Sequence, residues 1–403
     1  MARILFAWEL GGDYGHIARL LPIAHELAAR GHQCLFAVRD LLSAETLLTP
    51  SGFSAFQAPL WLSQVTNLPP AIGYAEMLMR FGFLNPKALT GICRAWRSLI
   101  DVLAADLLVL DHAPTALLAT RGLGLPRLHV GDGFCIPPSS RPLPPFRWWT
   151  RENILRLTES EEQARRNANA AILALEGPPL ASLGELFQAE ATMLCTFPEL
   201  DHYPSRSGPN YLGPIFSRDS GAPVAWPNRE GSHVFAYVKP GYPGFEAVLS
   251  ALSELNAAIL VHAPGAAKKT VAKFSSAGMA FSEEPVDIDQ VRATCRLTVC
   301  HGGAGTTSAM LLAGRPLLLL PMQMEQTMLA KRLVGLGVAR AVFGEDGSSV
   351  KHVLKAALTD EGLQRTALGF ASRHATYDAR NTIRAAADCC EKLLARKLPN
   401  ASQ

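Results

Sequence analysis

The start of the chain alternates between short apolar runs and one longer amphipathic stretch, and this alternation restricts the fold more than any other feature. Arg3–Trp8 (RILFAW) has the length and apolar content of a buried strand. The loop ELGGDYG and an amphipathic helix over about His16–Arg30 follow, Gly31 ends the helix, and Gln33–Val38 is the next expected strand. Because the unit is strand–helix–strand, it predicts a parallel sheet covered by helices.

The same alternation continues along the chain in two blocks. Further strands are expected at residues 107–110, 127–130, 234–238, 258–262, 297–300 and 317–320. Between the blocks, Phe216–Gly231 is rich in proline, glycine and charge and has no periodicity. A chain of 403 residues is also longer than one core usually holds. We therefore expect two doubly wound, Rossmann-like α/β domains, at residues 1–216 and 232–380, with a linker over 217–231. A C-terminal helix within 381–403 (about Thr382–Lys397) ends the chain, and its packing back on the N-terminal domain is left open.

Composition and charge exclude several classes of protein. Apolar residues make up 48% of the chain and charged residues 18%, which favours a packed globular protein over a disordered one. The net charge is +3 without a basic run, so nucleic acid is not an expected partner. The eight cysteines form no C-x-x-C pair, so reduced, buried thiols in a cytoplasmic protein are expected. Glu9 interrupts the N-terminal apolar run, which is too short for a signal peptide, and no run reaches the length of a membrane span.

Four polar residues follow predicted strands. His16 lies at the loop-to-helix junction after the first strand, Asp111 follows LLVL, His301 follows LTVC, and Glu325 follows LLLLP after a short loop. Ligands of open parallel sheets bind at the carboxyl ends of the strands. All four residues would therefore line one cleft if the two domains face each other through these edges.

The stretch HGGAGTT (His301–Thr307) is typical of an anion site. Its glycines let the backbone turn and approach a ligand, and a helix expected to begin near Thr306 would present free N–H groups and its positive dipole end. The hydroxyls of Thr306 and Thr307 and the ring of His301 could add donors. A phosphate is the anion that this arrangement favours, and a plain glycine turn with threonine caps is the alternative. The pattern is neither a P-loop nor a complete dinucleotide fingerprint.

Two further residue pairs suggest roles. Glu325 and Gln326 place a carboxylate and an amide at one strand end, where they could accept from one of two vicinal hydroxyls and donate to the other; an acidic helix N-terminus is the alternative. His16 at a helix N-terminus should be neutral, as a general base must be, and Asp111 could orient its ring. A capping histidine is the alternative there.

Three segments resemble the glycosyltransferases of the GT-B fold, and most closely the UDP-glycosyltransferase (macrolide and glucuronosyl) family. They are GHIARLLPIAHELAARGH (Gly15–His32), TFPELD with NYLGPI (within Thr196–Ile215), and CHGGAGTTSAMLLAGRPLLLLPMQMEQTMLAKRLVGLGVA (Cys300–Ala339). The last covers the donor-binding motif of that family and is highly specific. The resemblance implies two domains facing each other across a cleft, with the acceptor site in the first and the nucleotide-sugar site in the second.

The resemblance also implies roles for residues and a mechanism. The donor diphosphate would lie against His301, Gly302, Gly303, Gly305, Thr306 and Thr307, and the donor sugar against Glu325 and Gln326. His16 would be the base on the acceptor hydroxyl, with Asp111 behind it. The family inverts the anomeric carbon in one displacement without a metal, so no cofactor is expected and the nucleotide sugar is a co-substrate.

Departures from the family pattern leave alternatives open. GGDYGH also resembles the glycine-rich loop of the peptidoglycan N-acetylglucosaminyltransferases, and some relatives with antibiotic acceptors use an aspartate in this loop, so Asp13 is a rival base. The region SEEPVDID lacks the tryptophan that stacks on uracil in plant members, which leaves UDP and dTDP both open. A nucleotide-sugar 2-epimerase and a non-catalytic GT-B activator subunit are the alternative functions.

The acceptor, the donor sugar and the oligomeric state cannot be read from the sequence. The first domain contains apolar segments around Trp148 and Trp149 that could line an acceptor pocket or contact a membrane surface. Asp132 and Phe134 follow a strand of the same domain and are further acceptor candidates, although a turn aspartate is equally expected. Asp287 and Asp289 spell D-x-D, but they precede a short helix, where acids cap the N-terminus.

Overall fold

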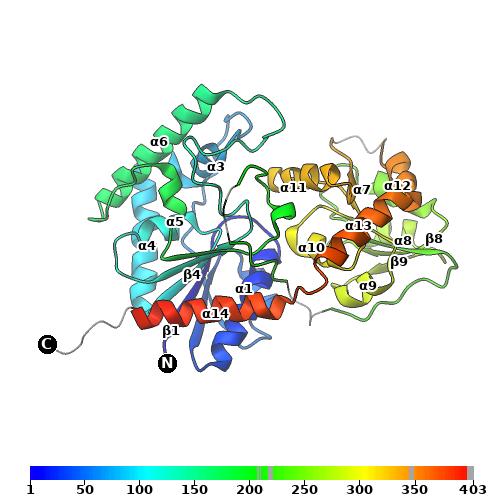
Figure 1. Cartoon of the computed structure of the whole chain (residues 1–403), viewed down its shortest axis with the longest axis horizontal. Coiled ribbons are helices and arrows are strands. Elements are labelled where there is room, and N and C mark those ends of the chain that lie inside the picture. Colours follow the sequence, from blue (N-terminus) through cyan, green and yellow to red (C-terminus); the bar gives the residue numbers. More distant parts are fainter. Residues whose placement is uncertain (207, 209, 217–220, 345–348, 397–403) are drawn as a thin grey trace. The chain divides into compact units, whose positions relative to one another are not determined.

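Two parallel sheets organise the chain, one in each of two units. The structure, a computed structural model, describes residues 1–206, 208, 210–216, 221–344 and 349–396. Met1–Ile215 and Asp378–Gln403 form the first unit, and Phe216–Tyr377 forms the second (Figure 1). The chain therefore leaves the first unit once and returns to it at its C-terminal end.

The sheet of the first unit has the strand order β3-β2-β1-β4-β5-β6, and neighbouring strands run parallel. The strands are β1 (Arg3–Trp8), β2 (Gln33–Val38), β3 (Ser54–Gln57), β4 (Leu107–Asp111), β5 (Arg127–Gly131) and β6 (Ala191–Leu194). The order reverses between β1 and β4, whose carboxyl ends pair at Trp8 and Asp111. Ligands of doubly wound sheets bind at such a switch point.

The sheet of the second unit repeats this arrangement, with the parallel order β12-β11-β10-β7-β8-β9. Its strands are β7 (Ser232–Tyr237), β8 (Ala257–His262), β9 (Met279–Ser282), β10 (Leu297–Cys300), β11 (Leu317–Leu319) and β12 (Ala339–Ala341). The switch point here lies between β7 and β10. The expected α/β architecture of two doubly wound parallel sheets is confirmed.

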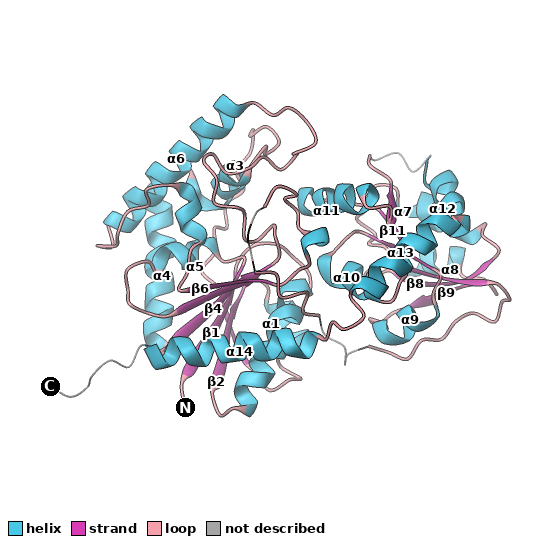
Figure 2. Cartoon of the chain, viewed as in Figure 1, coloured by secondary structure: helices cyan, strands magenta, loops and turns pink. Residues whose placement is uncertain are grey.

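Helices cover the sheets of both units (Figure 2). The first unit contains α1 (Gly15–Ala29), α2 (Leu41–Leu47), α3 (Tyr74–Leu78), α4 (Pro86–Val102), α5 (Pro114–Ala119), α6 (Ile154–Leu173) and α14 (Ala379–Arg396), with short 3-10 or π turns at Met79–Phe83, Leu183–Phe187 and Pro198–Leu200. The second contains α7 (Phe245–Ser253), α8 (Lys268–Phe274), α9 (Ile288–Thr294), α10 (Ala304–Leu312), α11 (Met324–Gly335), α12 (Val350–Thr359) and α13 (Glu361–Arg373). No helix of the described residues is long and apolar enough to cross a bilayer.

Helix α14 packs against α1 in the first unit (Figure 1). Its buried side chains, among them Cys390 and Leu393, belong to the same core as the apolar residues of β1 and α1. Arg30 at the end of α1 pairs with Asp388 at 2.6 Å and with Glu391 at 2.7 Å. The C-terminal helix α14 thus completes the hydrophobic core of the first unit. Lys397, the expected end of this helix, lies outside the described residues.

The described part of the segment expected to be a linker, residues 221–231, forms hydrogen bonds with helix α9 of the second unit. Val224 N–H donates to Gln290 Oε1 at 3.0 Å, and Trp226 Nε1–H donates to Thr294 Oγ1 at 3.0 Å. The Trp226 ring also stacks on His233, with centroids 4.4 Å apart. Residues 217–220 of the expected linker lie outside the described residues.

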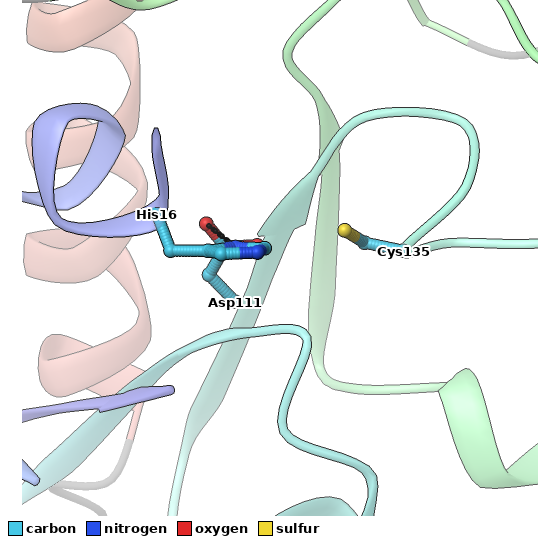
Figure 3. Close-up of side chains that lie close together, drawn as sticks. All are labelled: His16, Asp111 and Cys135. Carbon is cyan, nitrogen blue, oxygen red and sulfur yellow. Dashed lines mark ion pairs between the residues drawn. The ribbon is translucent and has the colours of Figure 1, made fainter. Parts of the chain in front are cut away.

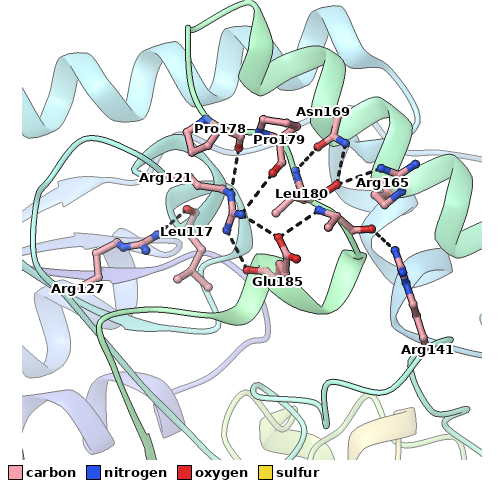
Figure 4. Close-up of polar contacts among 11 residues, drawn as sticks. Leu117, Arg121, Arg127, Arg141, Arg165, Asn169, Pro178, Pro179, Leu180 and Glu185 are labelled. Atoms are coloured by element: carbon pink, nitrogen blue, oxygen red, sulfur yellow. Dashed lines mark hydrogen bonds and ion pairs between the residues drawn. The ribbon is translucent and has the colours of Figure 1, made fainter.

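Polar side chains hold the proline-containing loop that follows α6 (Figure 4). Asn169 donates to the Leu180 carbonyl at 3.0 Å and accepts from the Leu180 N–H at 2.7 Å. Arg121 donates to the Pro178 carbonyl at 3.1 Å and pairs with Glu185 at 2.9 Å. Backbone groups that no strand or helix satisfies are thereby paired, which fixes the loop without regular structure.

The cysteines all lie in the described part of the chain, and none forms a disulfide. Seven are buried and Cys389 is half-buried. Burial raises the pKa of the Cys34 and Cys93 thiols to about 12, so both stay protonated at neutral pH. The thiols therefore act as small apolar packing groups, as expected from the sequence.

Candidate functional site

His16 and Asp111 meet at the switch point of the first sheet (Figure 3). His16 is the second residue of α1, and Asp111 is the last residue of β4. The two lie 3.2 Å apart, from His16 Nδ1 to Asp111 Oδ2. The Asp111 side chain is fully buried, whereas that of His16 is 12% exposed. A carboxylate on Nδ1 leaves Nε2 as the ring nitrogen that can take a proton from a ligand, which is the geometry of a general-base pair.

The loop between β1 and α1 contacts the Nε2 side of the His16 ring through Gly11. Gly11 has a φ of +90°, and a Cβ at this position would lie 2.3 Å from His16 Nε2. Trp8 stacks against the same ring, with centroids 5.2 Å apart. Asp13, the rival base, is exposed and has a φ of 62° in the same loop. The loop therefore needs glycine at position 11 both for its backbone angle and for the space around Nε2.

Arg19 links Asp111 to a second buried carboxylate. Its Nη1 donates to both oxygens of Asp111 at 2.9 Å, and its Nη2 donates to Asp132 Oδ2 at 2.8 Å. Burial alone would raise the pKa of Asp111, but the charges of Arg19 and His16 outweigh burial and hold it below its ordinary value. Asp111 is therefore ionised at neutral pH. Arg19 was not predicted as a site residue, and its one signal is its place among the apolar residues of the buried face of α1.

Asp132 is engaged within the protein on both of its oxygens. Oδ2 binds Arg19, and Oδ1 accepts from the N–H groups of Phe134 at 3.0 Å and Cys135 at 3.2 Å. Asp132 is 2% exposed and Phe134 is 5% exposed. These contacts are those of the alternative, a turn aspartate, with an added ion pair, and an acceptor contact of Asp132 stays a prediction. Phe134 packs on Phe146, with centroids 5.4 Å apart, and forms part of a buried aromatic cluster.

A second imidazole lies beside the first. The His112 ring centroid is 5.7 Å from that of His16, and the residue has a φ of 51°, which is uncommon for a side chain of this size. Burial, with a smaller contribution from His16, lowers the pKa of His112 to about 3, so the ring is neutral. Its Nε2 is buried and has no hydrogen-bond partner among the described residues. No sequence signal pointed to His112 apart from its place after Asp111.

Cys135 lies close to the base pair (Figure 3). Its Sγ and the ligand atoms of His16 and Asp111 all lie within 4.8 Å of one another, and this combination could bind a metal ion. Arg19 already donates to both oxygens of Asp111, so a cation would have to compete with a guanidinium for the carboxylate. The arrangement favours an ion-pair network over a metal centre, and the absence of a metal requirement stays a prediction.

The two tryptophans expected near an acceptor or a membrane are half-buried. Trp148 and Trp149 pack edge to face, with centroids 5.1 Å apart. Trp148 Nε1 is buried and has no hydrogen-bond partner among the described residues. Ile154 and Leu155, which follow in the chain, are 59% and 73% exposed. An acceptor contact and a membrane contact of this loop both stay predictions.

In the second unit, HGGAGTT joins β10 to the N-terminus of α10. The helix begins at Ala304 with Gly303 as its N-cap residue, two positions earlier than the start expected near Thr306. Gly302 has a φ of +88°, a conformation that favours glycine. The Thr307 side chain is fully buried, and its Oγ1 has no hydrogen-bond partner among the described residues. Free N–H groups at a helix N-terminus beside an unpaired hydroxyl are suited to binding an anion.

Both ring nitrogens of His301 form hydrogen bonds within the second unit. The Lys239 backbone N–H donates to His301 Nε2 at 2.9 Å, so Nε2 must be an acceptor. Nδ1 lies 2.7 Å from the Leu320 carbonyl and must therefore carry the proton and donate. Both ring nitrogens are used, so His301 connects the ends of three strands in this structure, and its contact with a donor diphosphate stays a prediction.

Glu325 and Gln326 open helix α11, which begins at Met324. Gln326 is 6% exposed, and its Oε1 accepts from the Met322 N–H at 2.8 Å. This hydrogen bond fixes the amide orientation, so Nε2 is the group left to donate. Glu325 is half-buried in the first turn of the helix. The two residues are adjacent in the first turn of the helix, and their role in binding a donor sugar stays a prediction.

Comparisons with known proteins agree with this architecture. No protein-family model matches the chain. The chain is 26% identical over 392 residues to the PGL/p-HBAD biosynthesis glycosyltransferase of Mycobacterium tuberculosis (strain ATCC 25177 / H37Ra), a match that covers 91% of this chain and 88% of that protein. It is 26% identical over 363 residues to the zeaxanthin glucosyltransferase of Pantoea ananas, covering 81% and 82% of the two chains.

Solved structures match over nearly the whole chain. The glycosyltransferase of kitacinnamycin superimposes with a TM-score of 0.71 at 18% identity and covers 99% of both chains. The spinosyn rhamnosyltransferase SpnG in complex with thymidine diphosphate superimposes with a TM-score of 0.66 at 16% identity, covering 95% of this chain and 99% of that one. The structural matches establish the fold, and the homologues establish the class of enzyme. The protein is a glycosyltransferase of the GT-B fold.

Proposed function

We propose that the protein transfers a sugar from a UDP or dTDP donor to a hydroxyl of a partly apolar small-molecule or lipid acceptor, with inversion and without a metal. The observation that carries the proposal is the His16–Asp111 pair, 3.2 Å apart, at the switch point of the first sheet. A relative acts on zeaxanthin by its name, and SpnG has been solved with thymidine diphosphate and with spinosyn aglycone. These relatives support a nucleotide donor and an apolar acceptor for this chain.

In the proposed reaction, His16 Nε2 accepts the proton of the acceptor hydroxyl. The acceptor oxygen forms a bond to the anomeric carbon on the face opposite the diphosphate. The bond from that carbon to the diphosphate oxygen breaks, and its electron pair leaves with the oxygen. Asp111, ionised at neutral pH, stabilises the imidazolium as it forms. The protein thus supplies a base on one side and stabilisation of the leaving group on the other.

The leaving diphosphate would bind at the N-terminus of α10. The free N–H groups of its first turn, the Thr306 hydroxyl and the unpaired Thr307 hydroxyl are the donors there. Glu325 and Gln326 would hold the donor sugar, with Gln326 Nε2 as donor and the Glu325 carboxylate as acceptor. His112 Nε2, buried beside the base, is suited to hold a second polar group of the acceptor.

His16→Ala tests the proposal. We expect the substitution to abolish transfer, by more than about a hundredfold, while calorimetry shows nucleotide binding unchanged, because the proposed donor site lies on the second unit. Asp13→Asn is the matched control from the same loop and should retain most activity. Near-normal turnover in His16→Ala with loss in Asp13→Asn would assign the base to Asp13. New sugar product formed from donor without an acceptor would indicate an epimerase, and loss of transfer in EDTA that Mg²⁺ restores would contradict the metal-free reaction.

A further inference from the structure

The base pair belongs to a larger buried group of charges that spans three elements. Arg19 from α1 donates to both oxygens of Asp111 on β4 and to Asp132 after β5. Arg19, Asp111 and Asp132 are 7%, 0% and 2% exposed. His16, one turn before Arg19 on the same helix, has its Nδ1 3.2 Å from the same Asp111 oxygen that Arg19 contacts. Since all four side chains are withdrawn from bulk water, their charges act on one another with little screening.

The positive charge of Arg19 weakens the stabilisation that Asp111 can give to a His16 imidazolium, and the negative charge of Asp132 restores it. A guanidinium bound to both oxygens of Asp111 neutralises much of the negative charge that the carboxylate offers to His16. With Arg19 and Asp111 alone, the cluster would have a net charge of zero before proton transfer and +1 after it. Asp132 adds a second negative charge. The cluster then has a net charge of −1 while His16 is neutral and of zero when the imidazolium has formed.

We propose that Arg19 and Asp132 are positioning residues that complete a four-member cluster with His16 and Asp111, charged −1 so that the proton taken from the acceptor hydroxyl brings it to neutrality. Arg19 also holds the two carboxylates in place, because two adjacent buried carboxylates without a cation would share a proton. This inference rests on the proposed role of His16 as the base. It adds that the strength of that base is set by residues that touch neither substrate.

Other titratable groups also face the cluster, and three of them are neutral at pH 7. Burial raises the pKa of the Cys195 thiol to about 12 and lowers the pKa of His112 to about 3 and that of His129 to about 4. These three groups therefore add no charge to that of the four members. The remaining groups that face it are His202, which acts on Asp132, and Cys135, which acts on Arg19.

Asp132→Asn and the double variant Arg19→Met/Asp132→Asn test the charge count. Asp132→Asn raises the net charge to zero, so the imidazolium should be less stable. The acid limb of the pH profile of kcat/KM should move to lower pH by about one unit, and the plateau should fall about tenfold. The double variant again has a net charge of −1, so its acid limb should return to that of the wild type. A limb that stays in place in Asp132→Asn while only the plateau falls would reduce Asp132 to a structural residue and overturn the proposal.

A matched ion pair at the other end of β5 provides the control. Arg127 binds Glu190 through two hydrogen bonds of 2.9 and 3.0 Å, away from the base. Glu190→Gln and Arg127→Met/Glu190→Gln should leave the acid limb in place. Should Asp132→Asn fail to fold, Asp132→Ser also raises the net charge to zero and must show the lowered acid limb, while Arg19→Lys, which keeps the charge, must show that of the wild type.

A second measurement separates this inference from the proposed function. Diethyl pyrocarbonate acylates neutral imidazole, and peptide mass spectrometry reports the pH at which His16 is half-reactive without any transfer reaction. This pH should fall in Asp132→Asn and recover in the double variant. If it does so while His16→Ala retains transfer, the cluster stands and the base assignment fails. If it does not move while His16→Ala is inactive, the base assignment stands and the cluster is contradicted.

Discussion

At the scale of single residues, the space around His16 Nε2 depends on one missing methyl group. A Cβ at Gly11 would lie 2.3 Å from Nε2, and its φ of +90° strains any other residue. Gly11→Ala should therefore displace the loop or the ring and lower kcat by about a hundredfold. Gly12→Ala is the matched control, because a Cβ there meets nothing within 4 Å. Equal loss in the two variants, with circular dichroism showing both folded, would mean that the loop and not the contact with Nε2 is at issue.

The sequence predicts the members of the base pair but not their surroundings. His16 and Asp111 could be placed together because both follow strands whose carboxyl ends share one edge. Arg19 looks like an ordinary polar residue of an amphipathic helix, since its partner Asp132 is 113 positions away in the chain. Lys239 contacts His301 through its backbone N–H, a group that every non-proline residue has. Contacts of these two kinds depend on the folded backbone and leave no local pattern.

At the scale of elements, the loop after β1 holds helix α5 through a buried carboxylate. Glu9 accepts from Thr115 N–H at 3.0 Å, Thr115 Oγ1–H at 2.6 Å and Ala116 N–H at 2.6 Å. Burial raises the pKa of Glu9 to about 7, despite these hydrogen bonds. Because the folded pKa is above the unfolded one, the added stability is present below pH 4.5 and is lost as the pH rises to about 7.

Glu9→Gln should remove this pH dependence. Wild-type protein should lose about 3 kcal/mol of its free energy of unfolding between pH 4.5 and 7 through Glu9, and the variant should lack that contribution. Urea unfolding at both pH values measures the difference. Parallel pH dependence in the two proteins would show that Glu9 does not titrate in this range.

The contact of α14 with α1 should depend on its apolar side chains more than on its ion pairs. Leu393 is 5% exposed and packs in the core of the first unit. Leu393→Ala should destabilise that unit by about 2 to 5 kcal/mol. Arg30→Ala removes three partly exposed ion pairs, two to α14 and one to Glu26 within α1, and should cost less than about 1 kcal/mol. Chemical denaturation of the two variants measures both losses in the free energy of unfolding. A larger loss in Arg30→Ala than in Leu393→Ala would reverse this ranking.

The strands that the sequence did not predict are the edges of the two sheets. All eight central strands were expected, because strands buried on both faces appear as short apolar runs. The four others, β3, β6, β9 and β12, occupy the four edge positions, and each is partly exposed. An exposed strand of three or four residues has too few apolar positions for its period to stand out. Edge strands are then fixed by the strand beside them rather than by their own sequence.

At the scale of the whole molecule, the proposed base and the proposed donor site belong to different units. A nucleotide that binds only at α10 should stabilise the second unit, Phe216–Tyr377. At a concentration one hundred times its Kd, it should raise the free energy of unfolding of that unit by about 2.7 kcal/mol. Scanning calorimetry with UDP and with dTDP should therefore shift the transition of the second unit and rank the two nucleotides. A shift confined to the first unit would contradict the assignment of the donor site.

Thr307→Val makes this test specific to one hydroxyl. Thr307 Oγ1 is buried and has no partner among the described residues, so its removal should leave the stability of the ligand-free protein unchanged or slightly raise it. If the hydroxyl donates to the diphosphate, the nucleotide Kd should rise about tenfold, because a hydrogen bond to a charged group is worth about 1.5 kcal/mol or more. The shift that a fixed nucleotide concentration gives the second unit should fall accordingly. Thr270→Val, at a half-buried position of α8, is the control and should change neither quantity, whereas an unaltered Kd in Thr307→Val would remove this hydroxyl from the donor site.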